Sequence, residues 1–205
     1  MKLCAGSSIS TICCDPESYK LTHRHSHLME NEKNLTEKAA RIKLIILDAD
    51  GVLTDGKIIM SNNSDEVKTF NVRDGHGLVL AKRFNLEIAI VSGRESSVLK
   101  ARAKEFGIEL LFMKIWDKLS VYEEIKQKTG LKDEEIAIIG DDIVDLPMLK
   151  RAGLSVAPSD AEEEVLSRVD WVTTRPGGGG AVREMTDFIL KSKGLWDEVM
   201  KKYLQ

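Results

Sequence analysis

Acidic side chains stand at two places where an apolar run ends, and their types indicate chemistry on phosphate esters. Asp48 and Asp50 follow the apolar residues 43–47, and Asp141 follows residues 135–140. A carboxylate can attack phosphorus when a hard cation neutralises the repulsion between the two anions. A second carboxylate nearby can donate a proton to the leaving oxygen and later take one from water. The spacing therefore predicts Mg²⁺-assisted phosphoryl transfer, with Asp48 as nucleophile and Asp50 as acid and base.

Further polar residues complete the predicted site. Asp141 is expected to hold Mg²⁺ with Asp48 and with the main chain of Asp50. Ser92 can hold phosphate oxygens, and Lys118 supplies a compact positive charge beside them. Two more carboxylates are candidates to support the metal ligands, Asp142 and Asp145. Each motif alone also has a structural interpretation, such as a helix N-cap for the Gly-Asp-Asp sequence, but their joint occurrence favours function.

Alternating strands and helices are expected to position these residues. Apolar runs predict strands at 43–48, 87–93, 109–113, 135–142, 153–157 and 170–174. The stretches between them predict helices at 76–84, 95–106, 117–129, 144–151, 160–168 and 180–192. This order predicts an α/β fold, a doubly wound parallel sheet of Rossmann-like type. In such a sheet ligands bind beyond the carboxyl ends of the strands, which is where Asp48, Ser92 and Asp141 stand.

The segment between Asp55 and Asp74 interrupts this alternation. It contains two short strand-like runs around an Asn/Ser/Asp turn, which predicts a β-hairpin inserted after the first strand. The other connections are short and leave no room for a cap domain. We therefore expect three segments. Residues 1–40 form a disordered leader and lead-in, residues 41–192 the phosphatase domain, and residues 193–205 a C-terminal tail. Four glycines at 177–180 predict a loop that is either mobile or closely approached by other backbone.

Composition excludes several classes of function. The chain has 205 residues, 30 Lys and Arg against 33 Asp and Glu, and 5% aromatic residues, so neither a basic surface nor stacking groups predict nucleic-acid binding. No apolar run approaches the roughly 20 residues that span a membrane. All three cysteines lie in the first fourteen residues, which suits a reducing compartment and predicts a cytoplasmic protein.

Two motifs resemble those of the haloacid dehalogenase superfamily of aspartyl-phosphate phosphatases. They are D-x-D-G-V-L-T-D-G from residue 48 and G-D-D-x-x-D from residue 140. The resemblance covers residues 43 to about 190 and implies an aspartyl-phosphate intermediate. It implies the catalytic residues Asp48, Asp50, Ser92 and Lys118. It also implies a Mg²⁺ site formed by Asp48, Asp50 and Asp141.

Residues 70–75, 92–94, Arg102 and 179–184 resemble one capless family within this superfamily, the 3-deoxy-D-manno-octulosonate 8-phosphate phosphatases. This resemblance implies hydrolysis of a sugar acid phosphate in lipopolysaccharide biosynthesis. It also implies a homotetramer assembled by the hairpin, with a neighbouring subunit's C-terminal tail over each site. The substrate contacts that it implies are Asp50, Asn71, Val72, Arg73, Asp74, Gly75, Arg94, Arg102 and Lys118.

Two other functions stay open from the sequence. Related domains act on other sugar acid phosphates, such as a nine-carbon sialic acid phosphate, and similar domains serve as non-catalytic assembly modules. The intact Asp48, Asp50, Lys118 and Asp141 favour an enzyme, because an idle module has no physical need for this cluster of charges. A sugar acid carboxylate suits bidentate pairing with arginine. The candidates for that contact are Arg73, Arg94 and Arg102.

Overall fold

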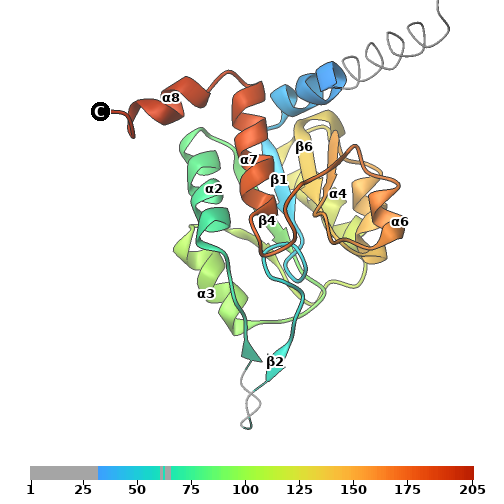
Figure 1. Ribbon diagram of the computed structural model, residues 1–205. Coiled ribbons are helices and arrows are strands. Elements are labelled where there is room, and N and C mark those ends of the chain that lie inside the picture. The colour runs from blue at the N-terminus through green and yellow to red at the C-terminus, as the bar shows by residue number, and fades with distance from the viewer. Residues whose placement is uncertain (1–31, 61, 63–65) are drawn as a thin grey trace, which may run out of the picture. The chain divides into compact units, whose positions relative to one another are not determined.

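A six-stranded parallel sheet forms the centre of the fold (Figure 1). The computed structural model describes residues 32–60, 62 and 66–205, so residues 1–31 of the predicted leader and lead-in lie outside the described residues. The chain divides into two units, residues 1–34 and 35–205, and the second contains the sheet. The strand order is β5-β4-β1-β6-β7-β8. The strands are β1 (Leu44–Leu47), β4 (Glu87–Val91), β5 (Leu110–Phe112), β6 (Ile136–Ile139), β7 (Leu154–Ala157) and β8 (Trp171–Val172).

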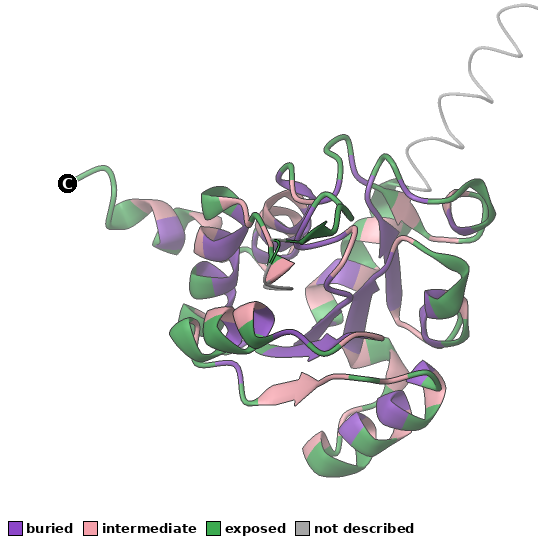
Figure 2. Ribbon diagram, turned by 90° about the horizontal axis from the view of Figure 1, so that it is seen from below, coloured by how far each residue is buried: buried purple, intermediate pink, exposed green. Residues whose placement is uncertain are grey.

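Helices cover both faces of the sheet. On one face lie α2 (Val72–Arg83), α3 (Ser97–Glu105) and α7 (Ala181–Ser192); on the other lie α4 (Lys118–Thr129), α5 (Leu146–Leu149) and α6 (Glu163–Leu166). Successive side chains of a strand point to opposite faces, so Ile45 and Leu47 pack in the first layer and Leu44 and Ile46 in the second. Figure 2 shows buried strands between the helices. Burial on both faces explains why the strands are continuous apolar runs in the sequence.

These elements confirm the predicted α/β fold with a doubly wound parallel sheet. The six strands fall within the six predicted ranges. The largest error in a predicted helix start is at α2, which begins at Val72 and not at residue 76. The Asn71 side chain caps α2 by accepting a hydrogen bond from the Arg73 main-chain nitrogen over 2.8 Å. Gly75 and Gly77, which disfavour helix, hide this first turn in the sequence pattern.

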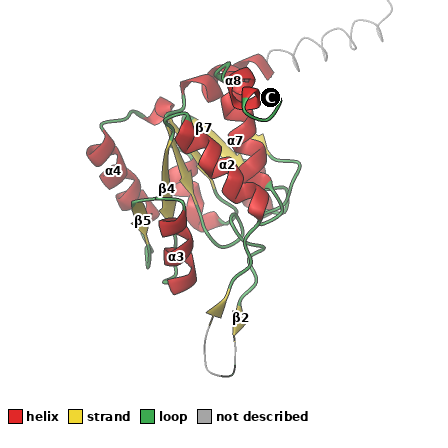
Figure 3. Ribbon diagram, turned by 90° about the vertical axis from the view of Figure 1, so that its left-hand side faces the viewer, coloured by secondary structure: helices red, strands yellow, loops and turns green. Residues whose placement is uncertain are grey.

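The predicted hairpin is confirmed. Its strands β2 (Ile59–Met60) and β3 (Glu66–Val67) pair antiparallel, with Ile59 opposite Val67, and residues 61 and 63–65 between them are not described. Figure 3 shows the strands of the hairpin lying away from the central sheet and its helices. In the described part of the chain, the other connections carry no cap domain.

The remaining elements are short. Two 3₁₀ turns, η1 (Asp133–Glu135) and η2 (Ile143–Asp145), flank β6, and residues 32–41 are helical. The predicted tail contains α8 (Trp196–Lys201), and the Tyr203 hydroxyl after it lies 3.0 Å from Nε2 of His76 on α2. Among the described residues, no helix combines the length and the hydropathy needed to cross a bilayer.

Candidate active site

The loops that follow several strands meet at one edge of the sheet around a cavity of about 260 Å³. β1 lies between β4 and β6, so the chain leaves β1 at the point where the order of strands reverses, the usual place for a ligand in such sheets. The lining includes Asp48, Asp50, Ser92, Arg94, Lys118 and Asp141. A larger cavity of about 590 Å³ lies beside Glu87 and Thr129 and contains none of the predicted site residues. The chemistry of the lining, and not the volume, identifies the candidate site.

Lys118 joins two buried carboxylates at the centre of this cavity. Its ammonium lies 2.5 Å from Oδ1 of Asp48, at the end of β1, and 2.5 Å from Oδ1 of Asp145. The Lys118 side chain is only 3% exposed. Burial alone would lower the pKa of Lys118, but the charges of Asp48 and Asp145 outweigh it and raise this pKa. The lysine is therefore held charged against Asp48, as the predicted role requires.

Three carboxylates crowd around one point of the cavity. Asp48, Asp141 and Asp145 each offer an oxygen, and these oxygens lie within 4.8 Å of one another. Burial and the charge of Asp145 raise the pKa of Asp48 to about 7, although Lys118 opposes the shift. Burial and the charges of Asp48 and Asp145 raise the pKa of Asp141 to about 8. Such repulsion between hard oxygen ligands fits a site for a divalent cation such as Mg²⁺.

Asp145 binds both Lys118 and the main chain of the loop after β6. Its Oδ2 accepts hydrogen bonds from the main-chain nitrogens of Asp141 and Asp142, over 3.1 and 3.3 Å. The Asp142 carboxylate instead caps the following turn, accepting from the Ile143 nitrogen over 2.6 Å. Of the two supporting carboxylates predicted from the sequence, Asp145 thus lies in the cluster, while Asp142 serves the turn.

Close backbone approach shapes the loop after β1. Gly51 has a φ of +92°, and a Cβ there would lie 2.0 Å from Oδ2 of Asp141, so any side chain would displace that carboxylate. The glycine-rich loop packs against the same segment: Gly178 donates to the Val52 carbonyl over 2.9 Å, and a Cβ on Gly177 would lie 1.7 Å from the Gly51 carbonyl oxygen. The sequence left open whether the glycine-rich loop is mobile or closely approached by other backbone, and the structure shows close approach.

Asp50 and Ser92 face the cavity from two different loops. The Asp50 carboxylate is paired with the ammonium of Lys68, which follows β3. Ser92 directly follows β4, is 3% exposed, and its hydroxyl accepts from the Arg94 nitrogen over 3.2 Å. Because the Asp50 side chain is turned to Lys68, it stands outside the cluster of three carboxylates.

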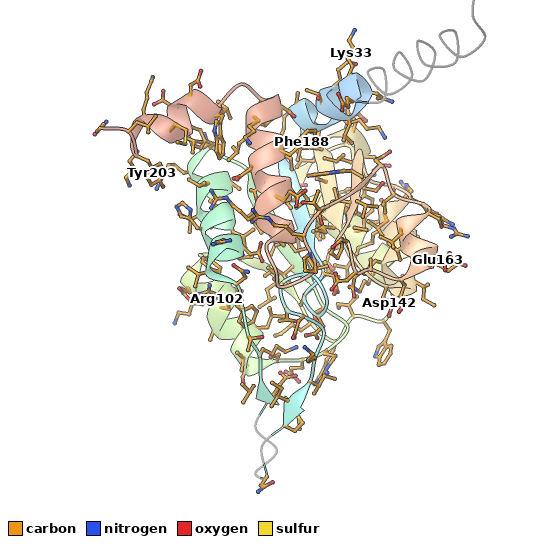
Figure 4. The ribbon with its side chains drawn as sticks, viewed as in Figure 1. Lys33, Arg102, Asp142, Glu163, Phe188 and Tyr203 are labelled. Atoms are coloured by element: carbon orange, nitrogen blue, oxygen red, sulfur yellow. The ribbon has the colours of Figure 1, made fainter. Side chains whose placement is uncertain are left out.

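The residues predicted to contact substrate are not gathered in one place in the single chain. Arg94 lines the cavity, whereas Arg102 on α3 stacks on Phe106, with its guanidinium 4.3 Å from the ring centre. Figure 4 shows Arg102 and Asp142 well apart. Asp74 is buried and accepts from the Arg183 nitrogen over 2.8 Å, and burial raises its pKa.

Residues 71–75 form the N-cap and the first turn of α2. The side-chain nitrogen of Asn71 donates to the Gly178 carbonyl over 3.2 Å, while Val72 and Arg73 are exposed to solvent. Gly75 is buried where a Cβ would lie 2.6 Å from the Phe106 ring and 2.8 Å from Arg102. A substrate role for this stretch and for Arg102 stays a prediction.

Lys68 and Glu66 are site residues that the sequence did not reveal. Lys68 pairs with Asp50, and Glu66 accepts from Nη2 of Arg94 over 2.9 Å. A charged residue in a hairpin usually faces water, so composition alone gives no signal for them. The signal that could have found them is their position, because the hairpin is inserted directly beside the loop that carries Asp50.

Comparison with known proteins places the chain among phosphatases. Residues 101–185 match the family of haloacid dehalogenase-like hydrolases. A protein of Salmonella typhi named 3-deoxy-D-manno-octulosonate 8-phosphate phosphatase is 41% identical over 194 residues, which are 95% of each chain.

Solved structures agree with this comparison. A phosphatase of that name from Yersinia pestis is 40% identical, with a TM-score of 0.79 over 80% of this chain and 89% of its own. The one from Moraxella catarrhalis, described in complex with a magnesium ion, a phosphate ion and a KDO molecule, is 37% identical, with a TM-score of 0.81 over 82% of this chain and 97% of its own. The resemblance inferred from the motifs is confirmed.

Proposed function

We propose a substrate and a mechanism from the premise that this chain belongs to the 3-deoxy-D-manno-octulosonate 8-phosphate phosphatase family of haloacid dehalogenase-like hydrolases. The protein is a phosphomonoester hydrolase. Its proposed reaction converts 3-deoxy-D-manno-octulosonate 8-phosphate and water to the free sugar acid and phosphate. One observation carries this proposal, the cluster of Asp48, Lys118, Asp141 and Asp145 at the carboxyl edge of the sheet.

Asp48 is the proposed nucleophile. Its Oδ attacks phosphorus, the bond to the sugar oxygen breaks, and an aspartyl-phosphate forms. Lys118 neutralises charge beside Asp48 and the transferred group. The proposed role of the Ser92 hydroxyl is to hold a phosphate oxygen, and its burial after β4 on the same cavity supports this role.

Asp50 is the proposed acid and base. It donates a proton to the departing sugar oxygen in the first step and takes one from water in the second, when that water attacks the aspartyl-phosphate. Asp50 stands two residues beyond Asp48 on the same loop and lines the same cavity.

The cofactor is Mg²⁺. The carboxylates of Asp48 and Asp141 would hold it, with the main-chain carbonyl of Asp50 as a further ligand. When bound, it neutralises the charge on the phosphate and on the carboxylates. Asp145, whose oxygens already accept from Lys118 and from main-chain nitrogens, holds these groups in place.

Arg94 is the proposed partner of the substrate carboxylate. Of the three arginines predicted for this contact, it is the one among the residues that line the cavity, and its side chain is 40% exposed and accessible to a ligand. The phosphate already has Lys118 and Ser92, so an arginine at the rim is available for a second anion.

The predicted assembly, compartment and pathway are also proposals. Exposed apolar side chains on and beside the hairpin support an assembly surface for the homotetramer: Ile58, Ile59, Met60 and Val67. The absence of cysteine after residue 14 supports a cytoplasmic location. The place in lipopolysaccharide biosynthesis follows from the proposed substrate.

Phosphate release from a panel of sugar phosphates tests this function. The panel contains the eight-carbon sugar acid 8-phosphate, a nine-carbon sialic acid 9-phosphate, and a neutral sugar phosphate, each with Mg²⁺ and with EDTA. We expect the highest kcat/KM for the eight-carbon substrate and loss of activity in EDTA. A higher kcat/KM for the nine-carbon substrate would replace the proposed substrate, and equal values for acidic and neutral sugars would remove the role of Arg94.

A further inference from the structure

Lys68 carries a buried charge that the proposed mechanism does not use. Its side chain is 3% exposed, although it belongs to the arm that links the hairpin to α2. A buried ammonium is costly unless acids compensate it. Its ammonium pairs with Oδ1 of Asp50 and lies 3.6 Å from Oε1 of Glu66. Asp50 lines the cavity and Glu66 contacts Arg94, which also lines it, so the compensation for Lys68 comes from residues at the site.

Glu66 connects this pair to Arg94, which lines the cavity from the loop after β4. Its Oε1 accepts from Nη2 of Arg94 over 2.9 Å, and its carboxylate also accepts from the Ser96 side chain. Burial would raise the pKa of Glu66, but Ser96, Lys68 and Arg94 together lower it, so the carboxylate is held ionised. The charges of Asp50, Lys68, Glu66 and Arg94 therefore alternate in sign along one chain of contacts. This chain joins the loop after β1, the hairpin and the loop after β4.

We propose that Lys68 is a positioning residue that sets the place of the Asp50 carboxylate and, through Glu66, the place of Arg94. The proposal rests on the proposed function, which makes Asp50 the acid and base and Arg94 the substrate contact. Lys68 draws the Asp50 carboxylate toward the hairpin and away from the cluster of Asp48, Asp141 and Asp145. Asp50 is thereby available to pass a proton between its carboxylate and the leaving oxygen or water, and Lys68 itself neither gains nor loses one.

The hairpin thus contributes to the chemistry of its own subunit. Lys68 directly follows β3, whose register is set by the pairing of Ile59 with Val67. A shift of one residue in this pairing would turn the alternating side chains of the arm to the other face and move Lys68 away from Asp50. The position of Asp50 therefore depends on the pairing of the hairpin as well as on the loop after β1.

The dependence of rate on the leaving group tests this role. A p-nitrophenyl phosphate needs little protonation of its leaving oxygen, whereas a simple alkyl phosphate needs a positioned acid, and neither has a carboxylate for Arg94. Since general acid catalysis contributes about 10²–10⁴-fold, Lys68→Met should lower kcat/KM for the alkyl ester at least about tenfold more than for the aryl ester. Lys68→Arg, which keeps a cation beside Asp50, should recover part of this difference.

A second variant tests the branch through Glu66. Glu66→Gln removes the charge that holds Arg94 and leaves the pair of Lys68 and Asp50. It should raise KM for the sugar acid phosphate several-fold more than for either simple ester. An equal rise on all three substrates would overturn the link from Glu66 to Arg94.

A matched control separates this role from a general effect on the hairpin. Lys57 lies on the other arm, its side chain is 76% exposed, and it pairs with Asp55 over 2.9 Å. Lys57→Met should leave kcat/KM for both esters unchanged.

Equal losses on aryl and alkyl esters in Lys68→Met, or no loss, would overturn the positioning role while the function of the wild-type protein stands. If Lys68→Met does not fold, the same comparison in Lys68→Gln, which also removes the cation, decides: a loss confined to the alkyl ester supports the role, and an equal loss or none overturns it. Absence of Mg²⁺-dependent hydrolysis in the wild-type protein would instead overturn the proposed function.

Discussion

Replacing Lys118 by methionine should destabilise the protein strongly, because this lysine compensates two buried carboxylates. Its ammonium lies 2.5 Å from both Asp48 and Asp145, and its side chain is 3% exposed. Removing one partner of a buried ion pair costs about 3–5 kcal/mol of unfolding free energy. For a domain of this size, each kcal/mol lowers Tm by about 2–4 °C, so the expected loss is on the order of 10 °C. Lys128→Met on the same helix is the control, because Lys128 is half-exposed and its pair with Glu124 is worth only about 0.3–0.5 kcal/mol.

The loss in Lys118→Met should grow with pH. Burial already raises the pKa of Asp48 to about 7, and without Lys118 this pKa rises further. The folded variant therefore binds more protons than the folded wild-type protein near neutral pH, so its stability falls more steeply as pH rises. One additional bound proton corresponds to about 1.4 kcal/mol per pH unit.

Thermal and denaturant unfolding in EDTA at pH 6 and pH 8 measures both effects. We expect the difference in unfolding free energy between Lys118→Met and the wild type to be clearly larger at pH 8. A loss no greater than that of Lys128→Met, or a loss that shrinks with pH, would refute the electrostatic account of Lys118.

Three other predictions concern the substrate, the glycine loop and the metal. Arg94→Ala should raise KM for the sugar acid phosphate about thirtyfold, equivalent to about 2 kcal/mol, and leave KM for p-nitrophenyl phosphate nearly unchanged in steady-state assays; equal rises would assign Arg94 to the phosphate. Gly177→Ala should lower the unfolding free energy by about 1–3 kcal/mol in denaturant titrations, because its Cβ meets the Gly51 carbonyl, and by more than Gly93→Ala, where the nearest atom, the Ile115 carbonyl oxygen, would lie 3.7 Å from the Cβ. In EDTA, the stability contributed by Asp48 and Asp141 should fall as pH rises from about 4 to about 8, because their folded pKa values are raised to about 7 and about 8 while the unfolded values are ordinary. Mg²⁺ should therefore raise Tm more at pH 8 than at pH 5.5, and an equal rise at both would contradict this linkage.

The strands, and the place of the motif residues at the ends of strands, were predictable because the signals are local. A strand such as β1, buried on both faces, has four apolar residues in succession, and the residue that follows it must lie at the carboxyl edge of the sheet. The position of Asp48 follows directly from this rule. The start of α2 was missed because Val72, at its first turn, is 80% exposed and the glycines at 75 and 77 interrupt the helical pattern.

The contacts of the charged side chains were not predictable, because they join residues far apart in the chain. Nothing in the local pattern indicates that Lys68 is buried and paired with Asp50, eighteen residues earlier. The same holds for Arg94 and Glu66, which are separated by 28 positions. Sequence reasoning assigned both Arg94 and Arg102 to the substrate. In the structure Arg94 lines the cavity, whereas Arg102 contacts Phe106 and Glu105 instead.

Direct detection of the acyl phosphate tests the central claim, that Asp48 is the nucleophile. The wild-type protein would be mixed with the eight-carbon sugar acid phosphate and Mg²⁺, quenched in acid within the first turnover, and reduced with borohydride, which converts an aspartyl-phosphate to homoserine. Peptide mass analysis then locates the modified residue. We predict homoserine at position 48, with none in unreacted protein. Modification at another carboxylate such as Asp50 or Asp141, or none at any carboxylate in protein quenched during turnover, would contradict the account.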